Sequence, residues 1–471
     1  EYEKRGRTSY WHTYGPAWMV KDKAYSQAHL PIAQQQTAIG HAVRFVYLMT
    51  GVAHLARLSH DESKRQDCLR LWNNMAQRQL YITGGIGSQS SGEAFSSDYD
   101  LPNDTVYAES CASIGLMMFA RRMLEMEGDS QYADVMERAF YNTVLAGMQL
   151  DGKRFFYVNP LEVVPGISGK AVTHRAVLPT RPQWYACACC PPNIARIVES
   201  VQEYAYTVAE DGGTLFTHLY MGGVAKAELN GTAVELDVTA NLPWQGDGKA
   251  VVRLGGDAAG TSAQAPARFT LAFRLPGWVG DESAAAAAIT ATGESESGAD
   301  SSRVTREIRD GYLYLTGEWR DGDTVTFDFP MPVRMLAANP LVREDAGKVA
   351  FVRGPLAYCA EGVDNGANLH LLHADTARIA SDPSCVSVDR IVFHAGAAAQ
   401  DEQGLGEVDA VDMPMTTLAI PAWREVEDSA QTSALYHDWR PAERKTTTAT
   451  LIPYFAWANR GENEMTVFLR G

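Results

Sequence analysis

The sequence predicts a multidomain protein of the α plus all-β class, with a helical part followed by two antiparallel β-sandwiches. Apolar residues recur at helical spacing up to about residue 206 and alternate with polar residues beyond it. The chain has 471 residues, of which 46% are hydrophobic. It can therefore bury large cores in roughly two to four domains. We expect a helical domain over residues 1–206 and sandwiches over residues 207–340 and 341–471.

Helical periodicity defines about six segments in the first part. Ile114, Met117 and Leu124, for example, fall on one helix face. The expected helices cover residues 33–58, 62–79, 108–126, 130–148 and 192–206, with a weaker one near 17–28. Loops such as residues 83–87, Thr-Gly-Gly-Ile-Gly, join them. This pattern predicts a bundle or an array of helical hairpins.

A period of two marks the strands of the second part. Val325, Phe327 and Phe329 alternate with polar residues, as expected for antiparallel strands with one solvated face. The acidic stretch 281–303 has little apolar surface, so we expect a loop between strands there. A second domain boundary is expected around residues 337–340.

Charge and composition exclude several partner classes. The 41 basic and 57 acidic residues give a net charge of −16, which disfavours nucleic-acid binding, so we expect a neutral small molecule or a sugar as partner. No apolar run reaches the length of a membrane span. The scattered cysteines are not those of a disulfide scaffold. We therefore expect a reducing compartment, and with it a cytoplasmic protein.

Three of the seven cysteines lie within four residues. Cys187, Cys189 and Cys190 are followed directly by Pro191 and Pro192. Proline is tolerated in the first turn of a helix, so the cysteines are predicted to lie at a helix N-terminus. The helix dipole lowers the pKa of a thiol there, and a bound metal would deprotonate it. Burial of three thiols as small apolar groups is the weaker alternative.

A second pair of possible ligands precedes another predicted helix. Glu109 and Cys111 are two residues apart, so in extended backbone both side chains point the same way. With Cys189 and Cys190 they would make a four-ligand set that suits zinc, although the spacing matches no standard zinc finger. Glu109 alone could instead be an acid favoured by the helix dipole.

A candidate proton donor lies in a loop rich in glycine and serine. Glu93 follows the segment 88–92, Ser-Gln-Ser-Ser-Gly, and loops on a helical scaffold often carry catalytic groups. Asp98, Asp100 and Asp104 are equally eligible from the sequence alone.

Four segments together resemble glycoside hydrolase family 127, the β-L-arabinofuranosidases. They are residues 82–87 with Glu93, 107–111, 156–160 and 187–193, and the resemblance runs through the whole chain in order. It implies a zinc-dependent, retaining exo-glycosidase that removes terminal β-L-arabinofuranose, for example from hydroxyproline-linked arabino-oligosaccharides.

The resemblance also implies a role for each matching residue. Cys189 would be the nucleophile and Glu93 the general acid/base. The zinc ligands would be Glu109, Cys111, Cys189 and Cys190, and the sugar would contact His41 and Tyr157.

Some of these residues have a structural alternative. His41 lies in a predicted helix, where a core histidine is common, and Tyr157 follows two phenylalanines and could serve in packing. Cys187 stays outside the ligand set. We expect Cys68, Cys359 and Cys385 to be structural.

The family's catalytic domain is an (α/α)6 toroid, whereas the sequence shows only about half of the helices that such a fold needs. We therefore expect residues 1–206 to be the C-terminal half of the toroid, completed by a segment that precedes Glu1. The chain by itself would then be inactive or poorly folded. The sandwich domains are candidates for homodimer contacts.

Two hypotheses of other classes remain open. The first is a non-catalytic carbohydrate-binding protein with a structural zinc site. The second is a thiol oxidoreductase, which is disfavoured because no C-x-x-C pair adjoins a βαβ pattern.

Overall fold

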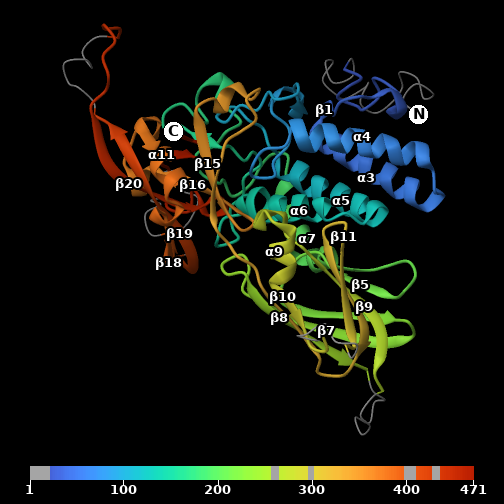
Figure 1. Cartoon of the computed structure of the whole chain (residues 1–471). Helices are drawn as coiled ribbons and strands as arrows, with labels where there is room; N and C mark the ends of the chain where they lie inside the picture. Colours follow the sequence, from blue (N-terminus) through green and yellow to red (C-terminus); the bar gives the residue numbers. More distant parts are fainter. Residues whose placement is uncertain (1–21, 256–264, 295–301, 397–409, 427–434) are drawn as a thin grey trace.

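The computed structural model describes residues 22–255, 265–294, 302–396, 410–426 and 435–471. Long helices come first along the chain, and strands dominate after residue 206 (Figure 1). The change in apolar period therefore coincides with the change in secondary structure, and the predicted combination of a helical part with all-β parts is confirmed at this level.

Among the described residues, the first part contains five long helices of 10 to 18 residues and one short helix of 4 residues. Asp61 and Asp129 start two of the long helices by accepting hydrogen bonds from the backbone amides of Lys64 and Gln131. The helices are α3 (Ala42–Ser59), α4 (Glu62–Arg78), α5 (Ser110–Glu127), α6 (Ser130–Ala139), α7 (Cys190–Ser200) and α8 (Gln202–Ala205). The predicted ranges 62–79, 108–126 and 192–206 agree with α4, with α5 and with α7 plus α8 within two residues.

Three predicted helices differ from the structure. The range 33–58 starts in a short 3-10 helix, Ile32–Gln34, and becomes α-helical only at Ala42, because Gly40 has φ +77° and forms, with His41, the short strand β1 (Gly40–His41). The range 130–148 leaves the α-helix at Phe140, where one π-helical turn, Phe140–Val144, follows. Of the weak segment 17–28, residues 22–28 form a turn instead of a helix, and the remainder lies outside the described residues.

Two five-stranded sheets form the middle part. Their strand orders are β10-β13-β8-β7-β6 and β11-β12-β9-β5-β4, and both sheets contribute to one hydrophobic core. Among the described strands of these two sheets, all pairs are antiparallel, as predicted, except β5 with β9, which is parallel. The strands are β4 (Tyr206–Val208), β5 (Thr214–Thr217), β6 (Gly223–Leu229), β7 (Thr232–Ala240), β8 (Asp247–Leu254), β9 (Ala267–Arg274), β10 (Ile289–Ala291), β11 (Val304–Arg309), β12 (Tyr312–Trp319) and β13 (Thr324–Asp328).

The stretch 281–303 is not the simple loop that its composition predicted. It forms α9 (Glu282–Ala287) and β10, while residues 295–301 lie outside the described residues. Asp281 caps α9, and Ala285, Ala286 and Ile289 are buried in the core. Small alanines supply the apolar surface here, because the helix lies close enough to the sheets for methyl groups to fill the space.

The last part contains one connected ten-stranded sheet where the sequence predicted the two sheets of a second sandwich. The helices α10 (Gly362–Asn365) and α11 (Thr376–Ser381) flank the strands. The strands of this part are β14 (Val333–Leu336), β15 (Lys348–Arg353), β16 (Leu356–Glu361), β17 (Leu372–Ala374), β18 (Ser387–Ala395), β19 (Val411–Glu425), β20 (Arg444–Pro453), β21 (Met465–Thr466) and β22 (Leu469–Arg470).

The tenth strand of this sheet, β3 (Glu162–Val163), comes from the helical part. It pairs with β21, so Met465 lies opposite Val163. A single hydrophobic core accordingly runs through the helices and the C-terminal sheet. Within the ranges described, no helix combines the length and apolarity needed to cross a bilayer.

Candidate active site

Three helices begin around one point, and a candidate site residue precedes each of them. His41, Glu109 and Cys189 occupy the N-cap positions of α3, α5 and α7, and α5 packs against both of the other helices. None of the three side chains hydrogen-bonds to the amides of its own helix. Three positive helix ends therefore favour carboxylates and thiolates at this point.

A short pair of strands brings Glu93 to His41. In β1 and β2 (Ala94–Phe95), His41 lies opposite Ala94, and Glu93 Oε2 is 2.8 Å from His41 Nε2. Tyr107 Oη donates to Glu93 Oε1 at 3.0 Å. Gly40 is required for this pairing, because a Cβ there would lie 2.0 Å from the carbonyl oxygen of Ala24. Both oxygens of the predicted acid/base are thus held in fixed positions.

Backbone pairing also places Tyr157 beside the helix starts. Glu109 forms a β-bridge with Val158, and the amide of Ser110 donates to the carbonyl of Tyr157 at 2.9 Å. As a result, Tyr157 Oη lies 3.1 Å from Cys189 Sγ. Tyr157 therefore does more than pack among aromatic rings, since its hydroxyl contacts Cys189, the predicted nucleophile.

The four predicted ligands converge. One donor atom each from Glu109, Cys111, Cys189 and Cys190 lies within 4.8 Å of all the others. Glu109 Oε1 is 3.6 Å from the sulfurs of both Cys189 and Cys190, and these two sulfurs are 3.8 Å apart. Glu109, Cys111 and Cys190 are buried, whereas Cys189 is accessible.

These separations match the edges of a tetrahedron around zinc. With Zn–S bonds of about 2.3 Å and Zn–O bonds of about 2.1 Å, tetrahedral geometry places two sulfurs about 3.8 Å apart and a sulfur and an oxygen about 3.6 Å apart. Glu109 Oε2 is buried with no hydrogen-bond partner among the described residues. A buried carboxylate without donors is the group that a cation would satisfy, so the donor set fits zinc.

The electrostatics of the cluster concentrate negative charge on one sulfur. Hydrogen bonds from the thiols of Cys111 and Cys190 lower the pKa of the Cys189 thiol. Burial raises the pKa of Cys190 and, with help from the Glu93 carboxylate, raises the pKa of Glu109 well above its usual range. Of the two adjacent thiols, the surroundings thus favour the thiolate form of Cys189, and a bound cation could replace the protons of its neighbours.

The other candidates from the sequence lie elsewhere. Asp98 is paired with Arg78 and Asn74, Asp104 with His174, and Asp100 is exposed. Cys187 is exposed and outside the four-donor group. Cys68 and Cys359 are buried, as expected of structural thiols, and Cys385 is partly buried. Of the four acids weighed from the sequence, only Glu93 reaches Glu109.

Sequence reasoning missed two tyrosines. Tyr107 holds Glu93, and Tyr185 Oη accepts from the amide of Tyr157 at 3.0 Å and donates to the carbonyl of Phe155 at 3.1 Å. Both lie within a few residues of a predicted ligand. Their closeness in sequence to Glu109 and Cys189 is the only feature by which the sequence could have identified them, because the fold decides where a tyrosine side chain points.

Comparison with protein families gives the same order of parts. Residues 4–203 match the model "Beta-L-arabinofuranosidase, GH127 catalytic domain", residues 214–331 the middle domain of the same family, and residues 333–470 its C-terminal domain. The chain belongs to glycoside hydrolase family 127. The resemblance noted in the sequence is thereby confirmed.

Individual members of family 127 match over nearly the whole chain. A "Non-reducing end beta-L-arabinofuranosidase" of Bifidobacterium longum subsp. longum is 39% identical over 446 residues, which are 95% of this chain. A solved family 127 β-L-arabinofuranosidase from Geobacillus stearothermophilus T6 superposes with a TM-score of 0.80 at 39% identity over 99% of this chain. A second solved family 127 β-arabinofuranosidase gives 0.73 at 32% identity over 96% of it.

The chain spans only part of the length of these family 127 relatives. It covers 61% of the Bifidobacterium protein, 65% of the Geobacillus structure and 63% of the other solved structure. The closed toroid, a preceding N-terminal segment, a homodimer and a cytoplasmic location stay predictions.

Proposed function

We propose that this chain carries the catalytic centre of a retaining exo-glycosidase that releases terminal β-L-arabinofuranose, with hydroxyproline-linked arabino-oligosaccharides as the substrate class. The observation that carries the proposal is the placement of Cys189. Its sulfur belongs to a zinc-type donor set, contacts Tyr157, and lies 3.6 Å from Glu109, which adjoins the pair of His41 and Glu93. The names of the family 127 relatives support β-L-arabinofuranose as the sugar that is released.

In this proposal Glu109, Cys111, Cys189 and Cys190 hold the zinc. When bound, the ion keeps the sulfur of Cys189 deprotonated at neutral pH and withdraws charge from it. Three buried donors anchor the site, whereas the accessible Cys189 faces the substrate.

The chain's own residues then perform a double displacement. Cys189 Sγ attacks the anomeric carbon while Glu93 gives its proton to the departing glycosidic oxygen, which leaves a thioglycoside on Cys189. Glu93 next takes a proton from water, the water oxygen bonds to the anomeric carbon, and the carbon–sulfur bond breaks. Two inversions give net retention, and a thiolate takes the place of the usual second carboxylate.

His41, Tyr107 and Tyr157 support these steps. The proton that Glu93 must deliver can be shared between Glu93 Oε2 and His41 Nε2, which are 2.8 Å apart. Tyr107 fixes the other oxygen, so Glu93 keeps one orientation in both steps. Tyr157 Oη can donate to the Cys189 sulfur, which stabilises the thiolate before attack and after departure. His41 and Tyr157 are also the residues placed to contact the sugar.

The test traps the covalent intermediate in the complete protein. p-Nitrophenyl β-L-arabinofuranoside has a good leaving group, so a Glu93→Gln variant should still form the thioglycoside but hydrolyse it slowly, since it lacks the base. Intact-protein and peptide mass spectrometry should then find one pentose on Cys189. Asp98→Asn, in the same loop region, is the matched control and should turn over like the wild type.

Two further outcomes would overturn the proposal. One is a pentose on a carboxylate instead of on Cys189. The other is a Cys189→Ser variant that loses zinc and stability while the wild type shows no turnover, since a structural zinc site in a carbohydrate-binding protein would behave in that way. Metal analysis of Cys111→Ser checks the ligand set and should find less than one zinc per chain.

A further inference from the structure

Arg181 is a buried cation without an acidic partner. The residue is 2% exposed, and no carboxylate within the described ranges forms an ion pair with it. Among the residues that the structure describes, its guanidinium donates to the carbonyl oxygens of Ala146 at 2.9 Å, Trp457 at 2.8 Å and Phe455 at 3.5 Å. Burial lowers its pKa to about 10. Burying an unpaired charge is costly, and the carbonyl contacts offset part of that cost while tying Arg181 to Ala146 and Trp457.

The guanidinium also closes a cluster of stacked side chains. Phe156 and Trp457 are nearly parallel, at 13°, with ring centroids 4.7 Å apart, and the guanidinium carbon of Arg181 lies 4.5 Å from the centroid of Phe156. Phe156 and Trp457 are completely buried. Trp457 belongs to the C-terminal part of the chain, so this cluster joins that part to the helical part.

Phe156 connects the cluster to the active site. Its carbonyl accepts from Ser110 Oγ at 2.9 Å, and the carbonyl of the next residue, Tyr157, accepts from the amide of Ser110. Ser110 lies between the predicted ligands Glu109 and Cys111. A shift of Phe156 therefore moves the hydroxyl of Tyr157 and the start of α5 relative to Cys189.

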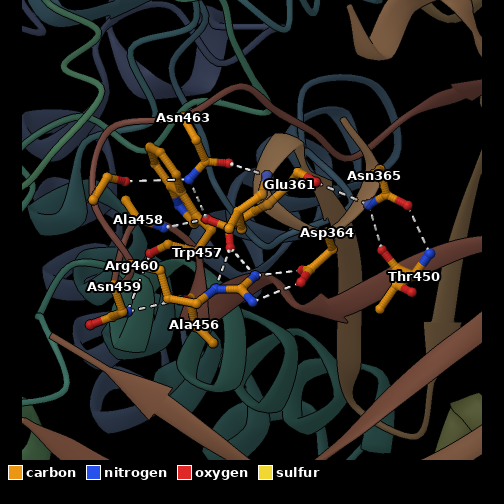
Figure 2. Close-up of polar contacts among 12 residues, drawn as sticks. Glu361, Asp364, Asn365, Thr450, Ala456, Trp457, Ala458, Asn459, Arg460 and Asn463 are labelled. Carbon is orange, nitrogen blue, oxygen red and sulfur yellow. Dashed lines mark hydrogen bonds and ion pairs between the residues drawn. The ribbon is translucent and has the colours of Figure 1, made fainter. Parts of the chain in front are cut away.

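The loop that carries Trp457, residues 454–463, is held by a buried glutamate (Figure 2). Glu361, at the end of β16, accepts from the amide of Ala458 at 2.8 Å, from Arg460 Nη2 at 2.5 Å and from Asn463 Nδ2 at 3.3 Å. Arg460 also donates to Asp364 at 2.8 Å. Glu361 thus holds the part of the loop that directly follows Trp457.

From these contacts we propose that Trp457 and Arg181 are positioning residues for the active site, acting through Phe156 on Tyr157 and on the start of α5. The C-terminal part then contributes to catalysis without touching the substrate. This inference rests on the proposed function, and the experiment separates the two by including a measurement that needs no turnover.

The first measurement is hydrogen–deuterium exchange of the complete protein. Trp457→Leu should raise the exchange rate of the amides in residues 108–112 and 154–159 at least about tenfold, because their hydrogen bonds lose their support. Exchange in β7 and β8 should stay as in the wild type. Trp457→Phe keeps a stacking ring and should restore protection. Trp423→Leu removes a tryptophan of the same C-terminal sheet that stacks on His373 and not on Phe156, and it should change neither segment.

The second measurement is the split between kcat and KM. Trp457→Leu should lower kcat about 10–100-fold with KM changed by less than about threefold, because misplacing reacting groups affects the transition state more than binding. Trp457→Phe should recover most of kcat. If Trp457→Leu does not fold, Arg181→Lys is the second variant, since it keeps the charge and loses the multiple hydrogen bonds.

The outcomes are distinct. If both local segments keep wild-type exchange in Trp457→Leu or Arg181→Lys, the positioning role is wrong, whatever the turnover. If exchange rises equally in all domains, the residues are merely structural and the inference also fails. If the wild type shows no turnover, the proposed function fails, while the exchange data still decide whether Trp457 supports this segment.

Discussion

Two buried glutamates, Glu109 and Glu361, have opposite surroundings. Glu361 is fully buried and accepts hydrogen bonds from a backbone amide, an arginine and an asparagine (Figure 2). Glu109 is 2% exposed, but its Oε1 contacts only two thiols and its Oε2 has no partner in the part of the chain that the structure describes. Burial raises the pKa of Glu109 well above its usual range.

The difference separates a structural charge from a functional one. A protein that buries a carboxylate for stability supplies its donors, as it does for Glu361. A carboxylate that is buried among thiols, with one oxygen left without a donor, is stable in its charged form only when a cation binds. A buried polar atom without a hydrogen-bond partner therefore indicates the functional site better than burial or charge alone.

Among the changes that test this difference, Glu109→Gln has the largest expected effect. We expect turnover to fall at least about 1000-fold. Zinc binding should weaken by more than the roughly 10–100-fold loss typical of removing a residue that only hydrogen-bonds to a zinc ligand. In metal-free protein the same change should raise the free energy of unfolding by about 1–3 kcal/mol, because it removes an unsatisfied buried acid. Urea unfolding with and without chelator checks this, and a metal-free variant less stable than wild type would contradict it.

The matched change at the structural charge is Glu361→Gln. We expect a loss of about 3 kcal/mol in the free energy of unfolding, with or without metal, because Arg460 loses its charged acceptor and faces the NH2 group that replaces Oε2. Asp364→Asn removes the outer, more exposed partner of Arg460 and should cost less than about 1 kcal/mol. Equal losses of unfolding free energy in Glu361→Gln and Asp364→Asn would show that burial of Glu361 does not increase its contribution to stability.

Asp345 is a buried acid whose surroundings are intermediate between those of Glu109 and Glu361. It is buried with one neutral donor, Asn103 Nδ2 at 2.7 Å, and burial raises its pKa from 3.8 to about 6. The folded state therefore holds the proton more tightly than the unfolded state, so this group's contribution to stability falls as pH rises from about 4 to about 6. Asp345→Asn should be more stable than wild type at pH 7 by up to about 3 kcal/mol. Unfolding free energies measured at pH 4.5 and pH 7 should show that the difference between Asp345→Asn and the wild type grows with pH. An equal difference at both pH values would contradict a raised pKa of Asp345.

Most of the fold could be predicted where local pattern decides it. The helices that start at Glu62 and Ser130 follow capping aspartates, and the strands around Leu236 and Phe327 follow strict alternation. The start of α3 could not be predicted in this way. The residues before it have helical propensity, but Gly40 adopts a left-handed conformation to pair His41 with Ala94, which is 53 residues away in the numbering of the chain.

The site followed a similar division. The sequence by itself determined which groups could act: three close cysteines before a proline-marked helix start, the Glu109 and Cys111 pair, and a resemblance that ordered them into roles. Only the tertiary structure decided that three helix starts meet, that Glu93 and not Asp98 reaches Glu109, and that Trp457 lies beneath the active-site segment. Residue type and local spacing fix chemistry and propensity, whereas distances between remote segments depend on packing of the whole chain.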